Sequence, residues 1–291
     1  MEQIIEVGGV NVVVHPHPEG QYEKLFRKAY RMKRPVRIHG DRHALMTMCD
    51  VKKHEGTTFA LEGEIATFSQ LDPSLPWINL ETEDDASSDE LGEIPAHLRP
   101  NFRKCQFYFD IASHKLFFLT TTRKGGISPG LMARYLKDLF AFSEIVLDFG
   151  EVGVTVLPDR DSISRILNWK KIRRLQIHAE RPNPGDYDPD ELEEFEQSLA
   201  EQNASQLNFE LVAEKGRALV LNDRTKTLVA IAADNGYVEA KGHNAQGAPE
   251  ERSTKTGKPF SERGEYNDDA ETYWDAFLRI ARTAARRFSV K

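Results

Sequence analysis

The sequence predicts an α+β protein with mixed or antiparallel sheets, helices packed on one face and a long C-terminal helix. Two runs rich in aromatic and β-branched residues, 105–111 and 115–121, follow each other closely, which is typical of a hairpin. Apolar residues recur at helical spacing in 21–32 and 128–140. A third apolar stripe of helical period runs through 267–288.

The N-terminal part of the chain predicts strands around one helix. Residues 4–15 (IIEVGGVNVVVH) indicate a tight hairpin or a bulged strand, because Gly8 and Gly9 interrupt a β-branched run. Segment 21–32 has apolar side chains on one helical face and basic ones around the other, and Pro35 marks its end. Strands are expected at 36–39, 43–51 and 58–68.

The middle of the chain predicts alternating helices and strands. Ser128 and Pro129 supply an N-cap and a first-turn proline for a helix that packs on the 105–121 hairpin. The next expected elements are a strand at 152–157, a short capped helix at 161–169 and a strand at 172–179.

The C-terminal part begins with an acidic helix at 189–201, predicted by a capping box at 188–191 and interpreted as solvated. It continues with an extended segment at 203–212, a mostly helical one at 218–234 and a strand at 237–241. The polar stretch 242–268 is expected to hold a hairpin arm that returns through 251–256, before Asn267 caps the final helix.

Length and pattern together predict two domains. Residues 1–184 are expected to form an N-terminal α+β domain that carries an acidic loop at 81–93. Residues 185–291 are expected to form a C-terminal domain with the final helix and the hairpin arm.

The two cysteines and the apolar runs bear on the compartment. Cys49 and Cys105 lie far apart, with no metal-ligand spacing, and are expected to be buried free thiols in a reducing environment. The longest apolar runs fall far short of the roughly 20 residues that cross a bilayer. We therefore expect a cytoplasmic protein without a membrane partner.

The net charge of −7 hides a segregation of signs along the chain. Residues 81–93 carry seven acidic side chains and 186–201 carry eight, with no lysine or arginine in either segment. Outside these segments 39 basic residues face 31 acidic ones, so the remaining body is basic. A basic body favours nucleic acid as the partner.

The stretch RSTKTGKPF at 252–260 resembles a phosphate-binding loop in its letters only. A Walker A loop needs a glycine where Arg252 stands and a hydroxyl where Pro259 stands. The stretch is better explained as the return strand of the hairpin arm, whose cations suit a phosphate backbone. An ordinary charged surface loop is the alternative.

Three basic tracts are the candidate nucleic-acid-binding residues, with no catalytic residue and no cofactor assigned. We expect them to gather on one face, with an aromatic ring able to stack on a base. The residues are Arg27, Arg31, Arg34, Arg37, Trp169, Lys170, Lys171, Arg173, Arg174, Arg252, Lys255 and Lys258. The leading hypothesis is a non-enzymatic DNA- or RNA-binding protein that acts as a homodimer.

Two other classes of function stay open. Glu239-Ala-Lys241 has the E-x-K spacing of a nuclease strand, in which the glutamate binds Mg²⁺ and the lysine helps activate water. The aspartate that such a site needs on a neighbouring strand is missing from the predicted elements. Alternatively, the acidic segments dock on a basic protein partner.

Two stretches carry a resemblance. The terminal helix TYWDAFLRIARTAARRF after its polar arm, and the run from FFLTTTRKGGISPGLMARYLKDLF to VGVTVLP, resemble a bacterial family of uncharacterised proteins of about 290 residues. The same stretches resemble the RexA exclusion protein of phage lambda. That resemblance implies DNA binding and a role in anti-phage defence or abortive infection, and it transfers no catalytic residue.

Overall fold

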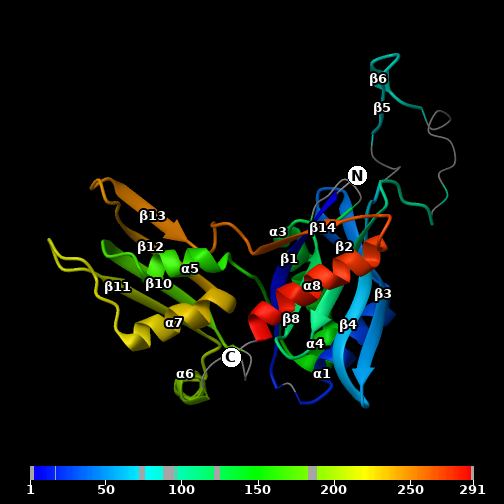
Figure 1. The fold of residues 1–291 in the computed structure, drawn as a ribbon. Helices are drawn as coiled ribbons and strands as arrows, with labels where there is room; N and C mark the ends of the chain where they lie inside the picture. The colour runs from blue at the N-terminus through cyan, green and yellow to red at the C-terminus, as the bar shows by residue number, and fades with distance from the viewer. Residues whose placement is uncertain are drawn as a thin grey trace.

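The computed structural model describes residues 3–16, 18–71, 76–87, 95, 97–120, 125–182 and 189–289, and omits the side chains of 3, 189–193 and 289. Within this part of the chain, the fold is α+β, as predicted. It contains seven helices, an eight-stranded sheet and a separate four-stranded sheet (Figure 1). Every strand pairing described is antiparallel.

The larger sheet has the strand order β14-β1-β8-β7-β4-β3-β2, and β9 pairs with β1 outside this path. Its strands are β1 (Gln3–Val14), β2 (Val36–His39), β3 (Arg42–His54), β4 (Thr57–Ser69), β7 (Arg103–Asp110), β8 (Lys115–Leu119), β9 (Val152–Val156) and β14 (Ser261–Tyr266). The hairpin expected at 105–121 is confirmed as β7 and β8.

The glycine pair near the N-terminus lies within one long strand, so the hairpin alternative is wrong. β14 pairs with the first half of β1 up to Gly8, and β9 pairs with the second half from Val10. A Cβ atom on Gly9 would lie 2.7 Å from Leu157 Cδ1. The glycines therefore allow neighbouring side chains to lie close to the β1 backbone at the point where the pairing partner changes from β14 to β9.

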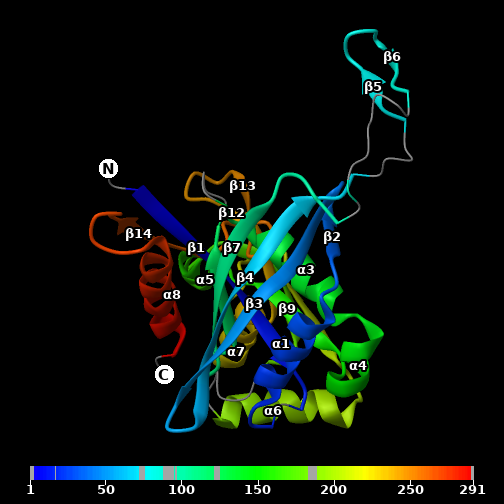
Figure 2. The same cartoon turned by 90° about the vertical axis from the view of Figure 1, so that its right-hand side faces the viewer.

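Helices cover the larger sheet on both faces. They are α1 (Gln21–Met32), α3 (Pro129–Phe140), α4 (Ser143–Phe149) and α8 (Tyr273–Ser289). Figure 2 shows α8 on one side of the strands and α1 and α3 on the other. The expected arrangement on one face does not hold for this sheet, because β7 is apolar on both sides. Phe109 packs on Phe26 of α1, whereas the ring of Tyr108 faces Arg282 of α8.

The smaller sheet has the order β11-β10-β12-β13 and is covered on one face only. Its strands are β10 (Ile172–Glu180), β11 (Gln206–Val212), β12 (Gly236–His243) and β13 (Pro249–Ser253), and its helices are α5 (Arg160–Leu167), α6 (Pro189–Glu201) and α7 (Asp223–Asp234). Leu175 and Ile177 of β10 pack with Ile231 of α7 in a core that also includes Phe195 of α6. The opposite face carries polar side chains.

The two sheets have separate hydrophobic cores. The first core takes residues from 5–157 and from 260–285, and the second takes residues from 166–240. The cores thus divide the chain into a first body, to which α8 returns, and a second body inserted between β9 and β14. The boundary expected at residue 184 falls within the second body, so the cores group the elements differently from the expected domains. A bridge between Pro158 and Pro259 joins the two connecting segments.

Buried polar side chains connect the two bodies. Lys115 of β8, whose exposed fraction is 1%, lies 3.8 Å from Asp234 of α7 through its Nζ and the Oδ2 atom. Asn11 of β1 donates from Nδ2 to Asn235 Oδ1 at 2.7 Å. These contacts fix the C-terminal end of α7 against the first sheet.

The acidic segments differ from one another. Residues 76–87 form a projection with the short strands β5 (Ile78–Asn79) and β6 (Asp84–Asp85), which extends away from the first body (Figures 1 and 2). The rest of the acidic loop expected at 81–93 lies outside the described residues. Helix α6 is not fully solvated, because Phe195 and Leu199 are buried in the second core.

Both cysteines are free, as expected, and Cys105 is fully buried while Cys49 is half-buried. Burial raises the pKa of the Cys49 thiol to about 12 and raises that of Cys105 as well.

Candidate functional site

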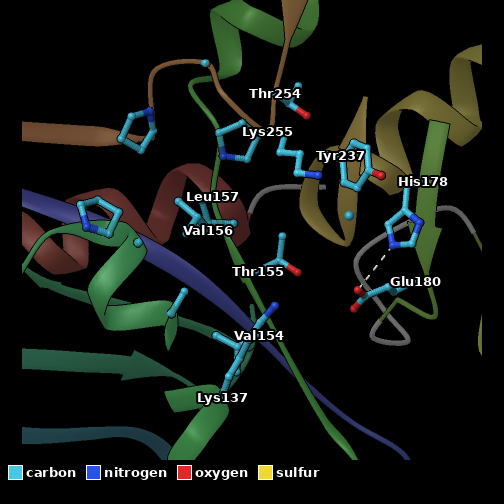
Figure 3. A pocket seen from close by; sticks show the side chains of 17 residues that line it. Lys137, Val154, Thr155, Val156, Leu157, His178, Glu180, Tyr237, Thr254 and Lys255 are labelled. Carbon is cyan, nitrogen blue, oxygen red and sulfur yellow. Dashed lines mark ion pairs between the residues drawn. The ribbon is translucent and has the colours of Figure 1, made fainter. Parts of the chain in front are cut away.

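A cleft of about 450 Å³ lies between the two bodies. One side is formed by α3 and β9 of the first body, and the other by β10, β12 and the segment 254–259 of the second (Figure 3). The polar face of the smaller sheet therefore meets the first body across this space. Its volume lies in the range of sites that bind small ligands.

A stacked pair of rings stands on that sheet face. His178 of β10 and Tyr237 of β12 are cross-strand partners, and their ring centroids are 4.8 Å apart with an interplanar angle of 22°. The ammonium group of Lys255 lies 4.4 Å from the centroid of Tyr237. Tyr237 thus lies between Lys255 and His178 (Figure 3). Cross-strand pairing places the rings together, because both residues alternate with buried ones on neighbouring strands.

A hydrogen bond and a contact with a carboxylate orient His178. Its Nδ1 atom lies 2.7 Å from Asn208 Oδ1 on β11. The other ring nitrogen, Nε2, lies 3.7 Å from Glu180 Oε1. The imidazole is therefore held in one orientation beside the cleft.

The segment that carries Lys255 is fixed by a compact turn. Ser253 Oγ accepts from the backbone N–H of Lys255 at 3.1 Å and of Thr256 at 3.3 Å. Thr254 exchanges two hydrogen bonds with the backbone of Val238, of 2.8 and 2.9 Å. The backbone of Lys255 is thus well defined, whereas its side chain is exposed.

The charges around the cleft are mainly positive. Lys137 of α3 and Lys255 line it, and neither forms an ion pair with a carboxylate among the described residues. Glu180 is the acidic residue on the lining. Lys258 is exposed on the segment 254–259 beside the cleft, and Arg160 is exposed at the first position of α5, where its guanidinium lies 4.2 Å from the ring centroid of Phe288. The arrangement suits a ligand that combines negative charge with a planar group.

The predicted residues on α1 and β2 lie on the first body, away from the β12–β13 hairpin in both views (Figures 1 and 2). Arg27 pairs with Glu23 at 3.0 Å, and Arg34 pairs with Glu144 at 2.9 Å. Arg37 donates from Nε to the carbonyl of Gly40, and Arg31 is exposed. The expected gathering of three tracts on one face is therefore not seen.

Trp169 is a core residue. Only 8% of its surface is exposed, and Nε1 donates to the carbonyl of His243 at 3.1 Å. The guanidinium of Arg252 lies 4.3 Å from the ring and pairs with Glu250 at 2.8 Å. These residues fasten the β12–β13 hairpin to α5, and they leave no free indole face for a base.

The cations beside Trp169 mostly make contacts within the protein. Lys171 donates to the carbonyls of Asn244 and Ala245, and Arg174 pairs with Glu210 at 2.5 Å. Arg173 donates to the carbonyl of Arg217. Lys170 is exposed. Of the twelve predicted residues, the structure places Lys255 on the cleft and Lys258 beside it.

Sequence reasoning missed Lys137, His178 and Tyr237 as site residues. Alternation along β10 and β12 put His178 and Tyr237 opposite the buried side chains, which was the available signal. For Lys137, one exposed lysine on an amphipathic helix carries no such signal.

Glu239 and Lys241 lie on the same face of β12 as Tyr237. Ser253 Oγ donates to Glu239 Oε1 at 3.4 Å, and Lys241 pairs with Glu251 at 3.3 Å. Among the described residues, no group of three or more His, Cys, Asp or Glu side chains could hold a metal ion.

The fold and the cleft define a two-body α+β protein with a basic, ring-bearing cleft between its sheets. Residues 3–282 match the family described as Domain of unknown function (DUF4747), and the chain belongs to this family. The comparison with curated proteins gave no match. Within the described residues, no helix is both long and apolar enough to span a bilayer.

Proposed function

We propose that this protein binds nucleic acid without cleaving it, and that the cleft and the polar face of the smaller sheet form the binding surface. The observation that carries the proposal is the stacked pair of rings on an uncovered sheet face, flanked by Lys137 and Lys255. Among the described carboxylates neither lysine has an ion-pair partner, so both ammonium groups can face a phosphate.

Nucleic-acid recognition combines two kinds of contact, one to phosphates and one to bases. Lysines contact phosphates and hold the chain in place, whereas rings on an open sheet stack on bases with little sequence preference. Glu180 beside His178 sets one limit on where a phosphate can lie, because like charges repel. The phosphates are therefore expected on the Lys137 and Lys255 side of the rings.

The lysines at the cleft that form no ion pair with a described carboxylate predict how strongly binding depends on salt. Two to three phosphate contacts, from Lys137, Lys255 and Lys258, give a slope of log affinity against log salt of about −2. This can be measured by fluorescence anisotropy with a labelled oligonucleotide at several salt concentrations.

Matched variants locate the surface. The double variant Lys137→Ala with Lys255→Ala is expected to bind at least tenfold more weakly and to lose most of the salt slope. Arg31→Ala removes an exposed cation from α1 and is expected to leave both quantities unchanged. Binding that depends on Arg31 and not on the lysines would move the interface to α1, and absence of binding at low salt would remove the function.

A metal-dependent nuclease is the second candidate, because Glu239 shares the strand face of Tyr237. Incubation with plasmid or RNA and Mg²⁺ or Mn²⁺ tests it. Cleavage by the wild type that Glu239→Ala abolishes would replace the binding function with catalysis.

The biological setting is part of the proposal. We propose a cytoplasmic homodimer that acts in anti-phage defence. The resemblance to the RexA exclusion protein supports the defence role alone, and the acidic projection supports an additional protein partner. Phage plating on cells that express the wild type or the double lysine variant tests the defence role. Equal plating on cells with and without the wild-type protein would contradict it.

A further inference from the structure

A second cavity adjoins the cleft at Glu180. This cavity, of about 480 Å³, is lined by Gly153, Glu151 and Arg181, and it shares Glu180 with the first. Gly153 directly precedes the β9 residues that line the first cavity. The two cavities, which we together call the groove, adjoin along β9, and their lining residues from Gly153 to Pro158 span about 16 Å at about 3.3 Å per residue.

A site that stacks one base on Tyr237 would favour single strands over duplexes. In a duplex each base face is covered by its neighbours, so no base can lie on Tyr237 without leaving the helix. An unstacked single strand offers its base faces freely. At about 3.4 Å per stacked nucleotide, a length of 16 Å receives about five nucleotides at most.

Lys255 occupies the place where a base would stack. Its ammonium lies 4.4 Å from the Tyr237 centroid, and its side chain is exposed. An exposed cation–π contact is weaker than base–aromatic stacking. A base can therefore displace the ammonium, and the freed ammonium gains a phosphate partner within reach.

We propose that the groove binds a single-stranded segment of nucleic acid, with one base stacked on Tyr237 in place of Lys255 and the adjoining phosphate held by Lys255 and Lys137. This inference rests on the proposed function and narrows it to a substrate class. His178 supports the ring from the opposite side, and Asn208 holds the imidazole in position.

The test uses the full chain and short oligonucleotides that contain 2-aminopurine, whose fluorescence falls when it stacks. We expect quenching on binding and a clear preference for the single strand over a duplex of the same sequence. Tyr237→Leu is expected to weaken single-strand binding by about 5- to 150-fold and to abolish the quenching, as loss of one base–aromatic stack requires. Tyr237→Phe keeps the aromatic ring and is expected to keep both the affinity for the single strand and the quenching.

The thermal unfolding of each variant shows whether it is folded. If Tyr237→Leu unfolds, the quenching of 2-aminopurine by the wild type and its preference for the single strand over the duplex keep the test decisive. Binding of a free mononucleotide is measured alongside, because a mononucleotide also offers a base and a phosphate. If free nucleotide monophosphate binds as tightly as the oligonucleotide, the ligand is a nucleotide and the single-strand proposal fails.

Different results would contradict single-strand binding and nucleic-acid binding as a whole. Equal binding of duplex and single strand, unchanged by Tyr237→Leu, would overturn the single-strand inference and leave nucleic-acid binding in place. Absence of binding to any oligonucleotide would overturn the proposed function itself.

Discussion

The larger sheet is covered by apolar residues on both faces, whereas the smaller sheet is covered on one and polar on the other. Phe117 and Phe118 are neighbours on β8, and both are fully buried in a sheet that has α8 on one face and α1 and α3 on the other (Figure 2). In β10, Leu175 is buried while Gln176 is half-exposed. The polar face of the smaller sheet therefore offers the cleft its ring-bearing surface, whereas the larger sheet lines the cleft only through its edge strand β9.

The largest loss of stability on substitution is expected in the first core. Phe117→Ala removes a ring that packs on Phe260 and Phe288, and it is expected to lower the free energy of unfolding by about 3 to 5 kcal/mol. Gln176→Ala on the open face is expected to change it by less than about 0.5 kcal/mol. Urea unfolding of both variants checks the contrast, and similar losses would mean that the polar face is packed as a core.

A smaller loss is expected where the two bodies meet. Lys115→Met removes the donor to the buried carbonyl of Ser113 at 3.1 Å and the ion pair to Asp234, with an expected loss of about 1 to 3 kcal/mol. Lys170→Met changes an exposed lysine and serves as the control in the same urea titration. A Lys115→Met protein as stable as wild type would show that this contact does not stabilise the packing of the two bodies.

Substitution of Trp169 tests whether this residue acts in the core of the second body or on its binding surface. Trp169→Phe loses the hydrogen bond to His243, so a destabilisation of about 1 to 2 kcal/mol is expected. Oligonucleotide affinity should stay within about twofold of wild type, because the ring is buried. An affinity that falls with little change in stability would instead place Trp169 in the interface.

The smallest effect concerns pH and the first body. The Thr58 hydroxyl, which donates at 2.6 Å, and the nearby Arg27 and Lys53 lower the pKa of Glu23 below its usual value of 4.5. Because the folded-state pKa is the lower one, the stabilisation is present above the unfolded pKa and is lost as pH falls through the folded value.

The measurement is the stability of wild type and Glu23→Gln across pH 2 to 7. The difference is expected to be below about 1 kcal/mol at neutral pH and to vanish at the acidic end. A difference that grows on acidification would contradict the sign of the pKa shift.

Local patterns in the sequence were sufficient for many elements. The helix expected at 21–32 is α1 with the same bounds, and its buried residues are those of the predicted apolar face. The helix after Ser128 and the 105–121 hairpin are also confirmed. Each of these depends on spacing within one segment, which the sequence contains in full.

The edge strand β14 was missed because its sequence has no strand pattern. SERGEY is polar, and its stability comes from pairing with β1 and from ion pairs such as Arg263 with Glu6 and Arg287 with Glu262. Polar edge strands look like loops when their partner is far away in the chain.

The sequence by itself determined the class of fold, most helices and strands, and the separation of acidic from basic segments. Only the tertiary structure decided which cations are available, because ion pairs with Glu144 and Glu210 depend on packing between distant segments. It also decided the site, since His178 and Tyr237 meet through strand pairing and Lys137 comes from the other body. Alternation and helical period are local properties, whereas a cleft is formed by residues that the chain brings together from far apart.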